Sequence, residues 1–210
     1  MKQSKPSLLI IMLCVILCYC VQPACAQTKK IPISSQRKYF YQLLKQSNLS
    51  FTFPQGFQEI KAVNNDDFSF DFALQDPDHS CEVWLMVRSQ KQNWQNYDQA
   101  ESDQKDQLAN PDSMYVELSK NYAATLSGNN ISAARDMPAD VLQDYNADAG
   151  KSYLLNLLDM PVTHHYKYAL IVALQKNHTG TLVAVYFTNY KDPDFYRDVN
   201  LASHCFKFNP

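Results

Sequence analysis

The chain has 210 residues, of which 46% are hydrophobic and 19% charged, and its formal net charge is −2. This length is sufficient for one sizeable core and short for two ordinary domains. Only 4 glycines are present, which excludes a collagen-like chain and a glycine-rich phosphate-binding loop. The near-neutral charge provides no basic surface of the kind that binds nucleic acid.

Residues 1–26 have the pattern of a secretory signal peptide. A short basic start precedes the apolar run from Leu8 to Val21, which is shorter than the roughly 20 residues of a membrane-spanning helix. Ala24-Cys25-Ala26 then forms an A-x-A cleavage pattern, so we expect the mature chain to begin at Gln27. A retained membrane anchor and lipidation at Cys25 are the alternatives. We therefore expect an exported protein, periplasmic or extracellular, whose mature chain has no transmembrane segment.

Removal of this segment changes the charge and the cysteine content. The mature chain keeps 17 basic and 21 acidic residues, a net charge of −4, and two cysteines, Cys81 and Cys205. Two cysteines in an exported protein favour one disulfide. It would close a loop of about 120 residues and stabilise the fold by about 4 kcal/mol in the chain-entropy model. Two unpaired buried thiols are the alternative, because the sequence does not give the distance between them.

A helix and a strand are expected first in the mature chain. Apolar residues at helical spacing follow Ser34 and Ser35, either of which can cap a helix that ends at Asn48. Residues 49–53 alternate between apolar and polar side chains and predict a strand.

The clearest period-two pattern lies in residues 68–74, where four large apolar residues alternate with smaller or polar ones: Phe68, Phe70, Phe72 and Leu74. We expect one strand with all four on a single buried face. Residues 81–88 then return as the second strand of a hairpin, with Trp84 on the face opposite Cys81. We expect Trp84 to pack under a helix rather than to remain exposed.

The later elements are expected in this order: a polar loop or solvated helix at 90–109, a helix from Asn110-Pro111 to Gly128, a short helix at 138–145, strands at 152–159, 168–175 and 181–189, a helix at 192–202 and a strand at 205–208. The last two long strands are apolar on both faces, as in a sheet covered on both sides. The expected fold is therefore α/β (α+β): a three-layer sandwich in which helices cover a central, largely antiparallel sheet of about six to seven strands. It forms a single domain over residues 27–210.

Two segments resemble PsbP-like domains, whose fold is shared with the Ran-binding Mog family. Leu-Ser-Phe-Thr-Phe-Pro-Gln-Gly-Phe, residues 49–57, resembles the family's opening strand and Pro-x-Gly-aromatic turn. His-Cys-Phe-Lys-Phe, residues 204–208, resembles its closing strand. The resemblance covers about residues 47–210 and implies a secreted, bacterial-type member that acts as a non-catalytic accessory or binding domain. It carries no functional residue over to this chain.

His164-His165 is the strongest metal-ligand candidate, in a loop before an apolar strand, with His79 or His178 as an additional ligand from elsewhere. Zinc requires three or four ligands within tetrahedral reach, and adjacent residues rarely supply two of them. An exposed polar loop is the favoured interpretation, so we assign no metal and no cofactor.

Three other residues are candidates for ligand binding. Asp148 lies in Asn-Ala-Asp-Ala-Gly, residues 146–150, where its carboxylate could hold a turn or stand at the rim of a pocket. Trp94 and Tyr97 lie in the polar stretch, where an exposed aromatic patch would bind a sugar, a peptide or a partner protein.

Two functions remain open. The first, which we favour, is an exported, non-enzymatic accessory or binding module, with an unknown protein or small ligand as partner and a monomeric state. The second is an extracytoplasmic hydrolase with scattered catalytic histidine and aspartate residues, and it predicts a cleft where at least two of the histidines and acids meet. Its one nameable version uses Asp148, His164 and His165, and that version is excluded if the three lie far apart and solvated. No catalytic residue is assigned.

Overall fold

The computed structural model of the chain describes residues 33–78, 80–101, 105, 107–131 and 133–210. The expected signal peptide lies outside these residues. Ile33–Pro210 is a compact unit of its own. Its elements are, in chain order, α2 (Ser35–Gln46), β1 (Leu49–Phe51), β2 (Gln58–Ile60), β3 (Phe72–Gln75), β4 (Cys81–Ser89), α3 (Lys91–Gln99), η1 (Pro111–Ser113), α5 (Met114–Ser127), β5 (Arg135–Asp136), α6 (Ala139–Tyr145), β6 (Ala149–Asn156), η2 (Pro161–Thr163), β7 (Tyr168–Lys176), β8 (Gly180–Thr188), α7 (Pro193–Ser203) and β9 (Phe206–Phe208).

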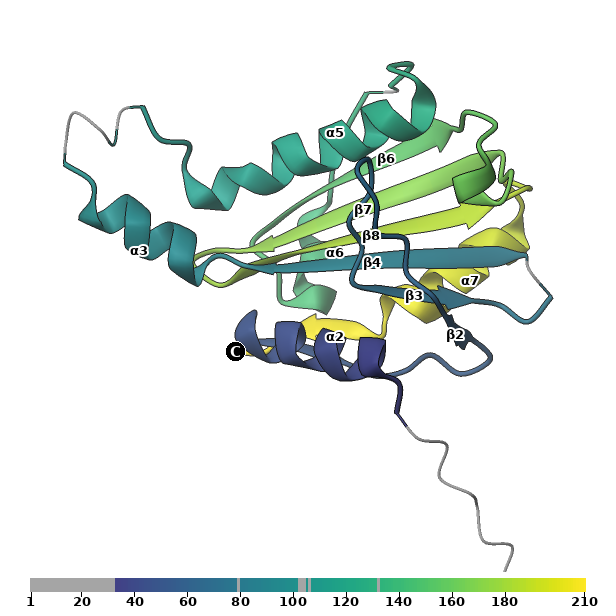
Figure 1. Cartoon of the computed structure of the whole chain (residues 1–210), viewed down its shortest axis with the longest axis horizontal. Coiled ribbons are helices and arrows are strands. Elements are labelled where there is room, and N and C mark those ends of the chain that lie inside the picture. Colours follow the sequence, from purple (N-terminus) through teal and green to yellow (C-terminus); the bar gives the residue numbers. More distant parts are fainter. Residues whose placement is uncertain (1–32, 79, 102–104, 106, 132) are drawn as a thin grey trace, which may run out of the picture. The chain divides into compact units, whose positions relative to one another are not determined.

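The central sheet has seven strands in the order β2-β3-β4-β8-β7-β6-β5, and every neighbouring pair is antiparallel (Figure 1). β1 and β9 pair in a separate two-stranded sheet. The expected α+β class and antiparallel sheet are therefore confirmed.

Two buried clusters lie on the two faces of the sheet. One cluster joins α2, α6, α7 and the β1–β9 pair to the sheet through residues such as Phe40, Phe72 and Phe206. The other lies under α5 and includes Trp84 and Tyr122. Figure 1 shows α5 over one face and α2 with α7 over the other. The fold is the three-layer sandwich predicted from the doubly apolar strands, and Trp84 is covered by a helix as expected. In the described part of the chain, no helix is long and apolar enough to cross a membrane.

Local capping explains why the main helices begin and end where the sequence predicts. The Ser34 hydroxyl accepts a hydrogen bond from the Arg37 N–H and starts α2. Asn110 caps η1, which leads directly into α5, and Gly128 ends α5 in the left-handed conformation at φ 63°. Asp192 caps α7 by accepting from the Phe195 N–H. The polar stretch contains α3, so the solvated-helix alternative holds for its first half.

The expected strand over residues 68–74 is wrong. Phe68 and Phe70 pack in the cluster with Trp84, whereas Phe72 and Leu74 pack in the cluster with Phe40 on the opposite face. The chain enters the sheet only at Phe72. At the preceding Asp71 the backbone N–H donates to the Leu85 carbonyl, while the carboxylate accepts the Val87 N–H of β4. That side chain supplies the acceptor that a longer strand would provide from its backbone.

The start of one other predicted strand needs correction. β6 begins at Ala149, three residues before the predicted start. It includes Gly150, which lies in the segment interpreted as a connector. A Cβ at Gly150 would meet Met137 Sδ at 2.8 Å, so a close approach accounts for glycine within this strand. β2 was not predicted, because its three residues are too few to show a pattern.

Candidate functional site

The hairpin between β7 and β8 brings Asp148 and Trp94 to the same end of the sheet. The Asp148 carboxylate accepts hydrogen bonds from the Asn177 N–H (2.8 Å) and from Lys176 Nζ (2.9 Å). It therefore holds a turn, but the turn is the β7–β8 hairpin and not its own segment. Asp148 lines neither of the two pockets described below.

Trp94, on α3, is fixed against the same hairpin. Its ring stacks on His178 with a centroid distance of 3.9 Å, and its Nε1 donates to Asp112 Oδ1 at 3.0 Å. The same Asp112 oxygen also accepts from the His178 N–H and from Gln175 Nε2, each at 2.9 Å. Asp112 thus joins α3, η1 and the hairpin. In the sequence, Asp112 lies two residues after a helix cap. That position indicates only a favourable negative charge at a helix N-terminus, and it does not indicate the contacts with α3 and the hairpin.

Tyr97 lies one turn further along α3 and lines a pocket of about 250 Å³, here called the α3 pocket. Its rim includes Leu108 and Met114, which are 46% and 42% exposed. The complete lining is Asn93, Asn96, Tyr97, Leu108, Ala109, Pro111 and Met114. The Tyr97 ring also packs edge-on against Trp94 at 5.4 Å. The two predicted aromatic residues therefore divide their roles: Trp94 anchors α3 and Tyr97 forms the wall of the pocket.

His164 and His165 lie at the opposite end of the sheet from Asp148. Asp148 immediately precedes β6, whose eight residues span about 26 Å, and the two histidines follow η2 beyond the other end of that strand. The three residues therefore do not meet in one cleft. This excludes the version of the hydrolase hypothesis that is built on these three residues. His178 stacks on Trp94 at the β7–β8 hairpin, away from His164 and His165. His79 lies outside the described residues.

Each histidine of the pair has its own carboxylate partner. His164 Nδ1 lies 2.8 Å from Oε2 of Glu82, whose side chain is 1% exposed. His165 Nδ1 bonds to Asp159, which is highly exposed. Both histidines have left-handed backbones, with φ of 49° and 60°. No group of three His, Cys, Asp or Glu residues is arranged to hold a metal within the described ranges.

Glu82 is the centre of a buried polar group that the sequence did not indicate. Besides His164, its carboxylate accepts from Trp84 Nε1 and, at 3.4 Å, from Gln75 Nε2. Tyr166 is 4% exposed and also bonds to the Gln75 side chain. Burial raises the pKa of Tyr166 to about 12, although the Gln75 hydrogen bond opposes this rise. In the sequence, Glu82 lies within an apolar strand, and nothing near it indicates that its partner is His164, 82 residues away.

The raised pKa of Tyr166 predicts a loss of stability at alkaline pH. The unfolded tyrosine ionises near the ordinary tyrosine pKa of 10.0 and the folded one near 12, so the folded state binds more protons between these values. The free energy of unfolding therefore falls as pH rises through this window, by on the order of 2–3 kcal/mol from this group. Urea unfolding at pH 9 to 12 should show a shallower slope in Tyr166→Phe, while buried tyrosines such as Tyr186, whose pKa burial also raises, keep the remainder. The exposed Tyr190→Phe serves as control, and an equal change of slope in both variants would contradict the assignment.

The candidate disulfide between Cys81 and Cys205 is not formed, and both residues are free thiols. Cys81 is fully buried at the start of β4, and burial raises the pKa of its thiol. Cys205 is partly buried after α7, where its Sγ donates to the Leu201 carbonyl, and burial raises its pKa as well. The fold thus holds both thiols in their protonated, unreactive form.

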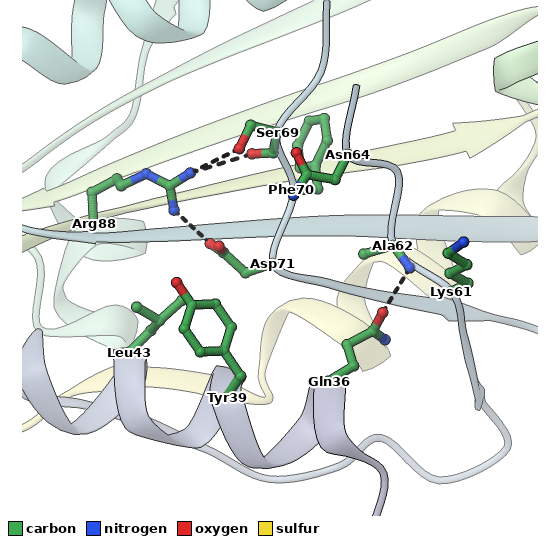
Figure 2. A pocket seen from close by; sticks show the side chains of 10 residues that line it. All are labelled: Gln36, Tyr39, Leu43, Lys61, Ala62, Asn64, Ser69, Phe70, Asp71 and Arg88. Atoms are coloured by element: carbon green, nitrogen blue, oxygen red, sulfur yellow. Dashed lines mark hydrogen bonds and ion pairs between the residues drawn. The ribbon is translucent and has the colours of Figure 1, made fainter. Parts of the chain in front are cut away.

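A second pocket, of about 400 Å³, lies between α2, β4 and two stretches of the β2–β3 connection, residues 61–64 and 69–71 (Figure 2). It is called here the α2 pocket. At one side Arg88 donates to Asp71 Oδ2 at 2.7 Å. Burial raises the pKa of Asp71, while the Val87 N–H and the Arg88 charge oppose the rise. At the other side the Gln36 amide bonds to the Ala62 N–H and to the Ile60 carbonyl, both at 2.8 Å. These bonds fasten α2 to the segment after β2.

Comparisons with known proteins yield structural similarity but no match at the level of sequence. The sequence matches no protein-family model and no curated protein. The solution structure of cyanobacterial PsbP (CyanoP) from Synechocystis sp. PCC 6803 is similar over 78% of this chain and 88% of that chain, with 11% identity and a TM-score of 0.43. CyanoP bears the name of the family that residues 49–57 and 204–208 resemble.

Proposed function

We propose that this protein is an exported, non-enzymatic binding module, and that the α3 pocket receives an apolar side chain of a partner protein. The observation that carries the proposal is the fixed position of Trp94. Its stacking on His178 and its bond to Asp112 hold α3 against the sheet. Because the wall of the pocket is already in place, binding need not order it first. Export is supported by the signal-peptide pattern of residues 1–26.

The lining of the α3 pocket favours an aliphatic or aromatic side chain over a sugar. Leu108, Pro111 and Met114 present carbon and thioether surface, and Tyr97 contributes one aromatic ring. A methionine at the rim adapts to side chains of different shape. A volume of about 250 Å³ fits one anchoring side chain rather than a whole ligand. Asn93 and Asn96 place amide groups at the edge, where a partner's backbone needs donors and acceptors.

A displayed library of random heptapeptides, selected on the purified protein, tests this proposal. We expect the enriched peptides to share an apolar anchor and to bind at least tenfold more weakly to Tyr97→Ala and Met114→Asp. An aspartate at position 114 suits the first turn of α5, so this variant should keep its fold. Tyr190→Ala is the matched control, because Tyr190 is an exposed tyrosine outside the α3 pocket.

Unchanged affinity in both pocket variants would refute the α3 pocket as the site. The fate of the peptide distinguishes the two functions. A binding module releases the peptide intact, as mass spectrometry would show, whereas peptide cleavage would favour the hydrolase. The second candidate is a hydrolase that uses His164 without Asp148 and His165, because Glu82 holds Nδ1 of His164 as a carboxylate holds a catalytic histidine.

A further inference from the structure

Hydrogen-bond donors surround the α2 pocket, while the one carboxylate in its lining is already engaged. That carboxylate, Asp71, accepts from the Val87 N–H at 2.8 Å and from Arg88 NH1 at 2.7 Å. Its side chain is only 8% exposed, so little of it faces a ligand. The lining carries two positive charges, Lys61 and Arg88, against the single negative charge of Asp71, so the pocket keeps a net positive charge.

Three donors retain capacity for a ligand. Arg88 NH2 contacts Ser69 only at 3.4 Å, which is long for a charged donor, and the Arg88 side chain is 38% exposed. Lys61 has no ion-pair partner within the described part of the chain. The Tyr39 hydroxyl has no hydrogen bond to any described residue, and the side chain is 54% exposed. Figure 2 shows this hydroxyl directed toward Asp71 and the Arg88 guanidinium group.

The rest of the lining fits the carbon skeleton of a small molecule. Leu43, Phe70 and the Tyr39 ring provide apolar surface between the donors. The volume of about 400 Å³ is within the range of pockets that enclose small organic ligands. Arginine presents two parallel donors that match the two oxygens of a carboxylate.

We propose that the α2 pocket binds a small organic acid whose carboxylate is held by the Arg88 guanidinium group and the Tyr39 hydroxyl, with Lys61 supplying a second positive charge. The residues of this site are distinct from those of the α3 pocket. The two sites can therefore be tested independently, and failure of one does not affect the other.

Isothermal titration of the purified protein with succinate, its uncharged diamide and inorganic phosphate tests the site. We expect millimolar affinity for succinate, weaker binding of phosphate and no binding of the diamide. Arg88→Lys keeps a positive charge beside Asp71 but loses the second donor edge, and it should weaken succinate at least fivefold. Tyr39→Phe and Lys61→Gln should each weaken it about threefold. Lys207→Gln, which removes the positive charge of the one exposed residue of β9, should leave the affinity unchanged.

Three results would overturn the proposal: no succinate binding at the wild-type pocket, equal affinity for succinate and its diamide, or a loss in Lys207→Gln as large as in Lys61→Gln. Tighter binding of phosphate than of succinate would overturn the assignment to carboxylates. Urea unfolding of each variant checks that it remains folded. If Arg88→Lys is unstable, the pair Tyr39→Phe and Lys61→Gln decides the question, because both side chains are at the surface.

Discussion

Replacing Trp84 by alanine should lower the free energy of unfolding by about 3–5 kcal/mol, the range for a large aromatic side chain in a core. Trp84 is fully buried, and its ring lies 4.4 Å from that of Phe187 and 5.1 Å from that of Phe70. Its loss would leave a cavity under α5 and remove a donor from the buried carboxylate of Glu82. Urea unfolding followed by circular dichroism measures this effect.

Trp94→Ala provides a matched comparison. Both tryptophans donate from Nε1 to a carboxylate, Glu82 or Asp112. Trp94 differs because it is only partly buried and stacks on the exposed His178. We expect its removal to cost about 1 kcal/mol. A cost for Trp94→Ala equal to that for Trp84→Ala would contradict the division between a core tryptophan and an anchoring one.

Asp71→Ala should lower the free energy of unfolding by about 3 kcal/mol, because it removes a buried acceptor that two donors share. The Val87 N–H would lose its partner within the sheet, and Arg88 would lose its ion pair. Arg88 is partly exposed, so water compensates for some of the lost charge interaction. The measurement is again urea unfolding at neutral pH.

Two variants isolate the cause of this loss. Asp71→Asn keeps an oxygen that can accept the Val87 N–H and removes only the charge, so it should cost less than the alanine variant. Asp159→Ala removes a carboxylate that is 83% exposed and paired with His165, and it should cost less than about 0.5 kcal/mol. An equal loss for Asp71→Ala and Asp159→Ala would show that Asp71 does not secure the edge of β3.

The sequence predicts best those elements in which an apolar pattern is bounded by a helix cap or a turn. α2 and α5 combine a helical stripe with a cap, and β7 and β8 are long apolar runs joined by a short turn. The segment with Phe68 to Leu74 shows why a repeat alone is insufficient. Phe70 and Phe72 keep the alternating spacing, but β3 begins only at Phe72, and the two rings pack on opposite faces of the sheet.

The candidate sites depended on contacts between distant segments. Trp94 and Asp148 could be selected as unusual residues, but only the β7–β8 hairpin brings them to one end of the sheet. The sequence gives no signal that Asp112 and Glu82 are centres of polar contacts. Asp112 lies at a helix start and Glu82 lies within an apolar strand. The donors of the α2 pocket come from α2, β4 and the segment after β2, and no local pattern relates them.

The pairing of β1 with β9 has a consequence for how the chain folds. Ser50 Oγ donates to the Lys207 carbonyl across 157 residues of sequence. Closing so long a loop costs entropy before the contact repays it, so this small sheet should be among the last parts to form. Until Phe206 and Phe208 arrive, the cluster around Phe40 lacks two of its buried rings. A nascent chain should therefore stay incompletely packed around Phe40 until β9 has been made.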